Sequence, residues 1–252
     1  MTPDDLLEVF AETAVAVRDA LLPVNGPARR NRTDVPGQYE IDLIADAAAL
    51  RVLHRVPVRV VSEESGVTGV IDAPVTVVID PIDGSTNCAR GIPYWAISLC
   101  ALDGAGALVA NVTNQVSGVA TTAVRGRGAW RDGSPIHASL VRDIKESVVA
   151  LEGRPVEFLG WKQFRALGSA ALALADVAAG VVDGYVDSNG VHKPWDYLGG
   201  WLACTEAGAV VIDELGRDLA VSESEASRQI LAAGTAELLD ALRPASREAH
   251  LT

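Results

Sequence analysis

The segment that most constrains this 252-residue chain runs from Asp80 to Asn87 and reads Asp-Pro-Ile-Asp-Gly-Ser-Thr-Asn. It follows the apolar run Val75–Ile79, whose β-branched residues are typical of a buried strand. Pro81 has no N–H and a fixed φ, so it stiffens the turn between two carboxylates. Gly84 permits a backbone conformation that a Cβ would forbid, and the three residues after it are good helix N-caps. Two rigid acids beside a helix N-terminus are able to hold hard cations and a phosphate together.

Three further acidic segments bear on this interpretation, because an isolated Asp-Gly pair is more often a plain turn. Residues 62–66, Ser-Glu-Glu-Ser-Gly, follow the apolar run Val58–Val61 and predict a second strand that ends in carboxylates. Asp196 falls in the first turn of a helix expected over Pro194–Ala207, and Asp42 opens another helix. Taken singly, the acids of residues 62–66 are better explained as an exposed turn, whereas Asp196 and Asp42 are equally well explained as carboxylates that complement a helix N-terminus.

Taken together, these segments resemble the inositol monophosphatase family, in which an E-E-S element, a D-P-[IL]-D-G-[ST]-x-N element and a W-D element ending in E-A-G follow in this order. Gly-Ser-Ala-Ala at 168–171, preceded by Arg165, and the glycine-rich segment 126–130 match further parts of the family pattern. The resemblance extends from about Asp42 to Val211. It implies a magnesium-dependent, lithium-sensitive phosphatase with a layered α-β-α-β-α sandwich, an α+β and α/β fold.

The same resemblance implies roles for individual residues. The metal ligands are Glu63, Asp80, the carbonyl of Ile82, Asp83 and Asp196. The catalytic residues are Glu63, Ser85, which orients the attacking water, and Asp42 behind it. The phosphate and substrate are expected to contact Asp83, Gly84, Ser85, Thr86, Asn189 and Asp196. All these ligands offer hard oxygen atoms, which favours two or three Mg²⁺ ions, replaceable by Mn²⁺, over zinc. Inhibition by Li⁺ is expected.

Several positions depart from the family pattern. Ser85 stands where the family usually has Thr and retains the hydroxyl, whereas residues 37–41 lack the usual T-x-x-D pattern. Asn189 replaces an acid that contacts inositol hydroxyls, and Lys193 adds a positive charge to the same loop. These changes leave the phosphatase chemistry in place but do not support selectivity for myo-inositol. His192 is expected to be an ordinary loop histidine rather than a substrate contact.

The net charge of −12 argues against nucleic-acid partners, which require a basic surface. It is compatible with a small phosphorylated substrate, because bound divalent ions would reverse the local field. No apolar run approaches the roughly 20 residues of a membrane span, and the acidic N-terminus differs from a secretory signal. We therefore expect a cytoplasmic protein without a membrane partner. A homodimer is expected by family analogy alone.

The cysteines do not form a zinc-binding motif, because Cys88, Cys100 and Cys204 are scattered along the chain. The last two lie in apolar segments and are expected to be small core residues.

The pattern of elements predicts two halves that share one active-site cleft. Residues 1–145 form an α+β half that carries most metal ligands, and residues 146–252 form an α/β half. Helices are expected over 4–22, 42–53, 169–179 and 194–207. Strands are expected over 58–61, 75–79, 95–102, 107–112, 119–124, 148–151, 185–187, 210–212 and 230–232. The first strands follow each other closely, which predicts an antiparallel meander. Residues 23–40 are expected to form a mobile basic loop, and the tail 246–252 to be frayed.

Several functions remain open at this point. Inositol monophosphate is the first candidate substrate, and fructose-1,6-bisphosphatase and histidinol-phosphate phosphatase are the alternatives within the superfamily. A phosphoadenosine phosphatase ranks lower, because Thr86-Asn87-Cys88 replaces the lysine and acid usual in that branch. In a different class, the chain is a catalytically idle metal-binding or regulatory protein with this fold. A calcium-binding loop is disfavoured, because the acids lack its twelve-residue spacing.

Overall fold

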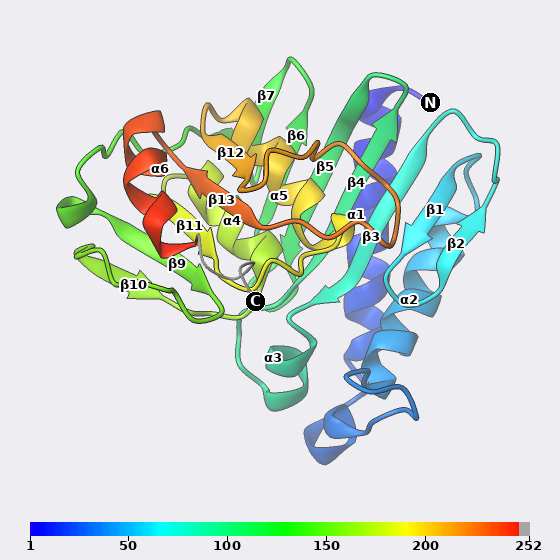
Figure 1. Cartoon of the computed structure of the whole chain (residues 1–252). Helices are drawn as coiled ribbons and strands as arrows, with labels where there is room; N and C mark the ends of the chain where they lie inside the picture. Colours follow the sequence, from blue (N-terminus) through cyan, green and yellow to red (C-terminus); the bar gives the residue numbers. More distant parts are fainter. Residues whose placement is uncertain (247–252) are drawn as a thin grey trace.

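Five layers of secondary structure form the computed structural model, which describes residues 1–246 (Figure 1). Two outer helices cover an eight-stranded sheet, two inner helices separate it from a five-stranded sheet, and a short helix covers the far face of the second sheet. This arrangement confirms the α-β-α-β-α sandwich expected from the sequence. None of the described helices combines the length and apolar character that crossing a membrane requires.

The first sheet has the strand order β2-β1-β3-β4-β5-β6-β7-β8. Its strands are β1 (Arg59–Ser62), β2 (Gly66–Gly69), β3 (Thr76–Asp83), β4 (Ala96–Asp103), β5 (Gly106–Asn114), β6 (Ala120–Val124), β7 (Gly128–Arg131) and β8 (Ser134–Pro135). From β3 to β8 each strand pairs antiparallel with the next, so the expected meander is confirmed. Strand β1 instead pairs parallel to β3, so both strands end at the same edge of the sheet.

Helices α1 (Pro3–Leu21) and α2 (Glu40–Leu53) cover the outer face of this sheet. Thr2 caps α1, accepting the N–H of Asp5 at 3.2 Å, and Phe10 and Val17 are among the fully buried residues of its apolar face. On α2, small buried alanines such as Ala45 let the helix lie close to the strands.

The second sheet has the order β10-β9-β11-β13-β12. Its strands are β9 (Val148–Glu152), β10 (Gln163–Arg165), β11 (Gly184–Asp187), β12 (Val210–Asp213) and β13 (Ile230–Ala233). Helix α6 (Ala236–Leu242) packs on β11 and β13 and closes the sandwich. All strands of the first sheet precede residue 145 in the sequence, and all strands of the second sheet follow it. The division of the chain into two halves at this residue stays a prediction.

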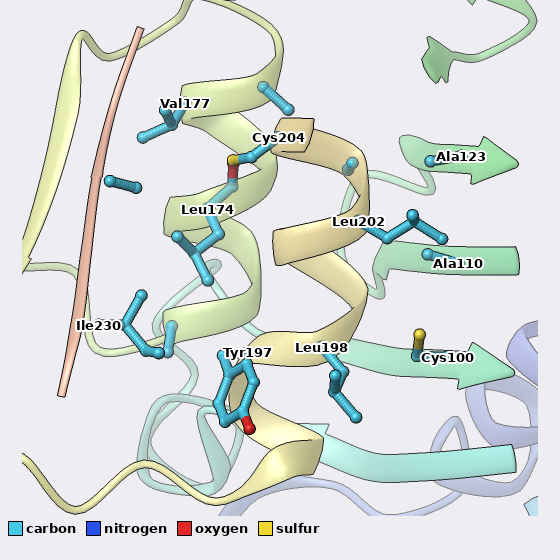
Figure 2. Packing of buried hydrophobic residues seen from close by; sticks show 14 of the residues in the cluster. Cys100, Ala110, Ala123, Leu174, Val177, Tyr197, Leu198, Leu202, Cys204 and Ile230 are labelled. Atoms are coloured by element: carbon cyan, nitrogen blue, oxygen red, sulfur yellow. The ribbon is translucent and has the colours of Figure 1, made fainter. Parts of the chain in front are cut away.

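Helices α4 (Ala170–Ala178) and α5 (Pro194–Glu206) fill the layer between the sheets. Figure 2 shows Leu198 and Leu202 of α5 turned toward Cys100 and Ala110 on the strands of the first sheet. The two helices pack side by side, and the Cys204 thiol donates a hydrogen bond of 3.1 Å to the carbonyl of Leu174 (Figure 2). The expectation that Cys100 and Cys204 are core residues is therefore confirmed.

Two glycines allow α5 to fit this narrow layer. A Cβ at Gly199 would lie 3.0 Å from Ser98 Oγ and 3.0 Å from a methyl group of Val112 in the first sheet. A Cβ at Gly200 would lie 2.4 Å from the Cβ of Leu174 in α4. Both glycines lie about one helical turn beyond Asp196, on the same side of the helix.

The structure corrects several expectations. Strand β3 does not end before Asp80 but continues to Asp83, with an irregular register between these two residues where Pro81 interrupts the ladder. Residues 23–40 are not a plain loop, because they contain a 3₁₀ turn at Gly26–Arg30 and a β-bridge from Arg32 to Tyr39. The expected frayed tail lies outside the described residues except for Ser246, which is buried.

Candidate active site

The acidic segments converge at the edge where β1 and β3 end. Glu63 follows β1, Asp80 and Asp83 occupy the irregular end of β3, and Asp196 lies in the first turn of α5. One carboxylate oxygen from each of Asp80, Asp83 and Asp196 lies within 4.8 Å of the others. Parallel pairing of β1 with β3 places Glu63 beside this group, and its carboxyl is in hydrogen-bond contact with that of Asp80.

Each of the three aspartates has one oxygen held by a donor of the protein. Asp80 Oδ1 accepts the N–H of Ile82 at 2.9 Å, and Asp196 Oδ2 accepts the N–H of Lys193 at 2.7 Å. Asp83 Oδ2 accepts the N–H of Ala171 at 2.8 Å and the hydroxyl hydrogen of Ser169. Within residues 1–246, the second oxygen of each aspartate accepts no N–H, so it would lose no such donor on binding a cation.

Electrostatics explain why such a cluster requires a counter-charge. Crowding of its carboxyl by the surrounding protein and the negative charge of Asp196 raise the pKa of Glu63 to about 8, although the residue as a whole is exposed. Burial, partly offset by the hydrogen bond from Ser169 and reinforced by Asp196, raises the pKa of Asp83 to about 7. Burial and the neighbouring acids also raise the pKa of Asp80 well above its usual range. A hard divalent cation would remove this repulsion, and the all-oxygen donor set fits one.

The residues expected to receive a phosphate form a tight turn next to these acids. Gly84 has a φ of +95° and caps the short helix α3 (Ser85–Arg90), and a Cβ there would lie 3.1 Å from the carbonyl of Gly168. The Ser85 hydroxyl donates to the carbonyl of Ile82 at 3.0 Å. Thr86 is exposed at the start of the same helix. Glycine is therefore required at 84 by its backbone conformation and by the close approach of the neighbouring segment.

Asp42 neighbours the Ser85 side chain. It is buried in the first turn of α2, where its Oδ2 accepts the N–H of Tyr39 at 2.8 Å. Its Oδ1 is buried without a hydrogen-bond partner among the described residues. Burial raises the pKa of Asp42, and the Tyr39 N–H and the neighbouring Ser85 hydroxyl oppose this shift. An unpaired buried oxygen of this kind is suited to accept a hydrogen bond from a substrate or a water.

Asn189 and Lys193 are not drawn into the cluster. Asn189 lies in the exposed turn after β11, where its backbone N–H donates to Asp187 Oδ1 at 2.7 Å. The Lys193 ammonium lies 3.3 Å from the carbonyl of Glu225, to which it donates. A role of either side chain in substrate binding therefore stays a prediction.

Sequence reasoning named Ser169, Asn87 and His192 but did not find that their side chains support the site. Ser169 holds Asp83, and Asn87 donates from Nδ2 to the carbonyls of Tyr94 at 2.7 Å and Leu167 at 2.6 Å. His192 is not a loop histidine in water but is buried against Asp196. Burial alone would lower the pKa of His192, but Asp196 and Asp187 raise it to about 9. The spacing of four residues between His192 and Asp196 was the sequence feature that could have indicated their contact.

Comparison with known proteins identifies the family. A sequence model of the inositol monophosphatase family matches residues 40–250. The chain belongs to this family. Members of the inositol monophosphatase family are metal-dependent phosphatases, and the acidic cluster described above is able to hold a metal ion.

Among its relatives, the fructose-1,6-bisphosphatase/inositol-1-monophosphatase of Thermococcus kodakarensis is 31% identical over 251 residues, 96% of this chain and 97% of that protein. The Nus factor SuhB of Escherichia coli is 36% identical over 172 residues, 62% of this chain and 63% of that protein. A solved structure from Pyrococcus horikoshii, described as a hypothetical protein with similarities to inositol-1 monophosphatase, superposes with a TM-score of 0.87 at 24% identity and covers 97% of this chain and 99% of its own. That structure supports the fold.

Proposed function

We propose that this protein is a Mg²⁺-dependent hydrolase of phosphate monoesters on small polyols or sugars, with inositol monophosphate as the first candidate substrate. The observation that carries the proposal is the geometry of Asp80, Asp83 and Asp196. One oxygen of each acid accepts a backbone N–H, and one carboxylate oxygen from each acid lies within 4.8 Å of the others. Such an arrangement positions oxygen ligands before a cation binds, which reduces the reorganisation that binding requires.

The proposed ligands are the carboxylates of Glu63, Asp80, Asp83 and Asp196 and the carbonyl of Ile82. When bound, divalent cations supply positive charge that offsets the charge of the phosphate and makes an attacking water more acidic. The choice of Mg²⁺, with Mn²⁺ as a substitute and Li⁺ as an inhibitor, belongs to the same proposal.

The residues around the cluster have separate proposed roles. The backbone N–H groups of Gly84, Ser85 and Thr86 donate to the phosphate oxygens. They lie at the start of α3, where N–H groups have no carbonyl partner within the helix. The Ser85 hydroxyl lies between Ile82 and Asp42, and it orients a water with Asp42 accepting behind it. Glu63, whose carboxyl contacts that of Asp80, is the proposed acceptor of a proton from that water.

The substrate is the least defined part of the proposal. The name of the Thermococcus relative includes both fructose-1,6-bisphosphatase and inositol-1-monophosphatase, so a bisphosphorylated sugar is the principal alternative. Histidinol phosphate is a further alternative. Because a relative bears the name Nus factor, a catalytically idle regulatory protein remains the alternative from another class. Intact metal acids disfavour that alternative.

Phosphate release from a substrate panel tests the proposal. Inositol 1-phosphate, fructose 1,6-bisphosphate, histidinol phosphate, phosphoadenosine phosphate and NADP would each be assayed with and without Mg²⁺. Asp83→Asn is the inactive reference, and Asp72→Asn, at an exposed residue before the start of β3 and so at the opposite end of that strand from Asp83, is the matched control. Mg²⁺-dependent release that is lost only in Asp83→Asn supports the proposal. A folded protein that releases no phosphate from any ester contradicts it.

Homodimer formation is a separate proposal that rests on family analogy. Sedimentation velocity of the purified chain at several concentrations tests it, and a single monomeric species would contradict it.

A further inference from the structure

A series of three contacting side chains, of which Tyr185 and His192 are buried, links the second sheet to the acidic cluster. The hydroxyl of Tyr185, on β11, lies 2.6 Å from His192 Nε2. The other ring nitrogen, Nδ1, lies 3.4 Å from Asp196 Oδ2. Tyr185 is 1% exposed and His192 is 8% exposed, so this link is shielded from water. Of these three side chains, only that of Asp196 is among the metal ligands proposed above.

The backbone around His192 is fixed independently of these contacts. Its carbonyl accepts the N–H of Arg228 at 2.8 Å, and the two residues form an antiparallel bridge. Upstream, Asp187 Oδ1 accepts the N–H of Asn189 at 2.7 Å and that of Gly190 at 3.2 Å. The loop between β11 and α5 is therefore held at both ends, and the imidazole is inserted between Tyr185 and Asp196.

This insertion determines which oxygen of Asp196 faces the other acids. Oδ2 accepts the Lys193 N–H at 2.7 Å and faces the imidazole on its other side. Rotation of the carboxylate away from this position would lose both contacts and would leave Nδ1 of the buried imidazole without an acceptor, although Asp187 Oδ2 would still lie 3.8 Å from Nε2. Oδ1 is then the oxygen that remains available to Asp80 and Asp83. Partners in the outer shell of a metal site act in this way, by fixing the orientation of a ligand.

We propose that His192 is a positioning residue that fixes the carboxylate of Asp196 for cation binding, and that Tyr185 in turn fixes the imidazole. The inference rests on the proposed function, because a cation held among the acids is what the orientation of Asp196 would serve. It assigns to His192 no contact with the substrate. It also gives a reason for a histidine at this position that the three motifs do not contain.

Direct metal binding tests the proposal without relying on turnover. The metal-free full-length protein would be titrated with Mn²⁺ while free Mn²⁺ is followed by electron paramagnetic resonance. We expect His192→Leu to weaken Mn²⁺ binding by about 10- to 100-fold, the usual effect of losing an outer-shell partner. Tyr185→Phe, which removes one hydroxyl, is expected to weaken binding by a smaller factor. His137→Leu, at an exposed histidine outside the site, is the matched control.

A pair of polar variants separates positioning from loss of packing and protects the test against a variant that fails to fold. The amide nitrogen of Asn can occupy the place of Nδ1, whereas that of Gln is better matched to Nε2. We expect His192→Asn to retain most of the Mn²⁺ affinity and His192→Gln to lose it. Excess Mg²⁺ is expected to restore kcat in the weakened variants.

The possible outcomes separate this inference from the proposed function. Wild-type affinity in folded His192→Leu, or equal affinity in the Asn and Gln variants, would overturn the positioning role. If the wild type binds Mn²⁺ but hydrolyses no ester, the proposed function fails while the effect of His192 on Mn²⁺ affinity still decides the inference. Absence of Mn²⁺ binding in the wild type would overturn both.

Discussion

Ser169 donates its hydroxyl hydrogen to Asp83 Oδ2, across a separation of 86 residues in the chain. The same oxygen accepts the N–H of Ala171 at 2.8 Å, so the first turn of α4 holds this carboxylate from one side. The Gly-Ser-Ala-Ala segment, which matches the family pattern without offering a metal ligand, therefore acts on the acidic cluster through Asp83.

Ser169→Ala tests this relationship. The variant removes the hydroxyl but leaves the Ala171 N–H, so Asp83 keeps one of its two donors. We expect the Mg²⁺ affinity, measured from the Mg²⁺ dependence of phosphate release, to fall by about 10-fold or more. Ser134→Ala, in the exposed edge strand β8, serves as the control. Equal Mg²⁺ dependence in the two variants would show that the hydroxyl does not position Asp83.

Asp83→Asn is expected to raise the melting temperature of the metal-free protein while abolishing turnover. Its carboxyl is buried beside like charges, which raises its pKa to about 7, so neutralising it relieves repulsion in the folded state. Mg²⁺ should stabilise the wild type by binding the folded state, and it should stabilise the variant much less. Differential scanning calorimetry with EDTA and with Mg²⁺ measures both effects. A lower melting temperature for metal-free Asp83→Asn would contradict the expected repulsion.

Asn87→Asp is expected to destabilise the protein by about 1–3 kcal/mol, the cost of leaving buried hydrogen-bonding groups unsatisfied. The Asn87 amide donates to the carbonyls of Tyr94 and Leu167, whereas a carboxylate would place negative charge against these oxygens. Urea unfolding of both proteins gives the difference. Asn25→Asp, at an exposed asparagine, should leave the free energy of unfolding nearly unchanged.

Asp213 is expected to contribute to the acid dependence of stability. Burial of its carboxyl opposes ionisation, but two hydrogen bonds from the Arg217 guanidinium and one from the Gln229 N–H hold the pKa of Asp213 at about 2. The unfolded state has a value of about 3.9, so this stabilisation is fully present above about pH 4 and is lost as the pH falls toward 2.

Chemical unfolding of the wild type and Asp213→Asn at several pH values checks this sign. At pH 7 the variant should be the less stable protein, and the difference should narrow between about pH 4 and pH 2. A difference that stays constant over this interval would show that the carboxylate of Asp213 is not the group responsible.

The motifs predicted much of the cluster, because each acid lies where a strand ends or a helix begins. Parallel pairing of β1 with β3 and the start of α5 then bring Glu63, Asp80 and Asp196 to one edge. The resemblance to the family implied the layered fold, and the antiparallel meander was predictable because its strands follow each other closely along the chain. These features depend on local patterns that a single sequence contains.

The supporting contacts were not predictable, because they join positions with no local relationship. The bond from Asn87 to the carbonyl of Leu167 spans 80 residues, and nothing near either residue indicates the other. The extension of β3 through Pro81 was missed for a different reason. A proline usually ends a strand, and here the irregular register accommodates it. His192 was read as an ordinary loop residue because its burial depends on β11 and on the bridge to Arg228.

The absence of side chains at Gly199 and Gly200 has a consequence for how this enzyme family member could be altered. Because neither glycine has a Cβ, α5 can pack closely against both the first sheet and α4. Asp196 lies about one turn away on the same helix. A methyl group at either position would clash with the first sheet or with α4. The clash would displace α5 and move Asp196 away from the aspartates of β3. The separation between Asp196 and the aspartates of β3 therefore depends on how α5 packs in the apolar interior, at positions that belong to none of the proposed metal or substrate contacts.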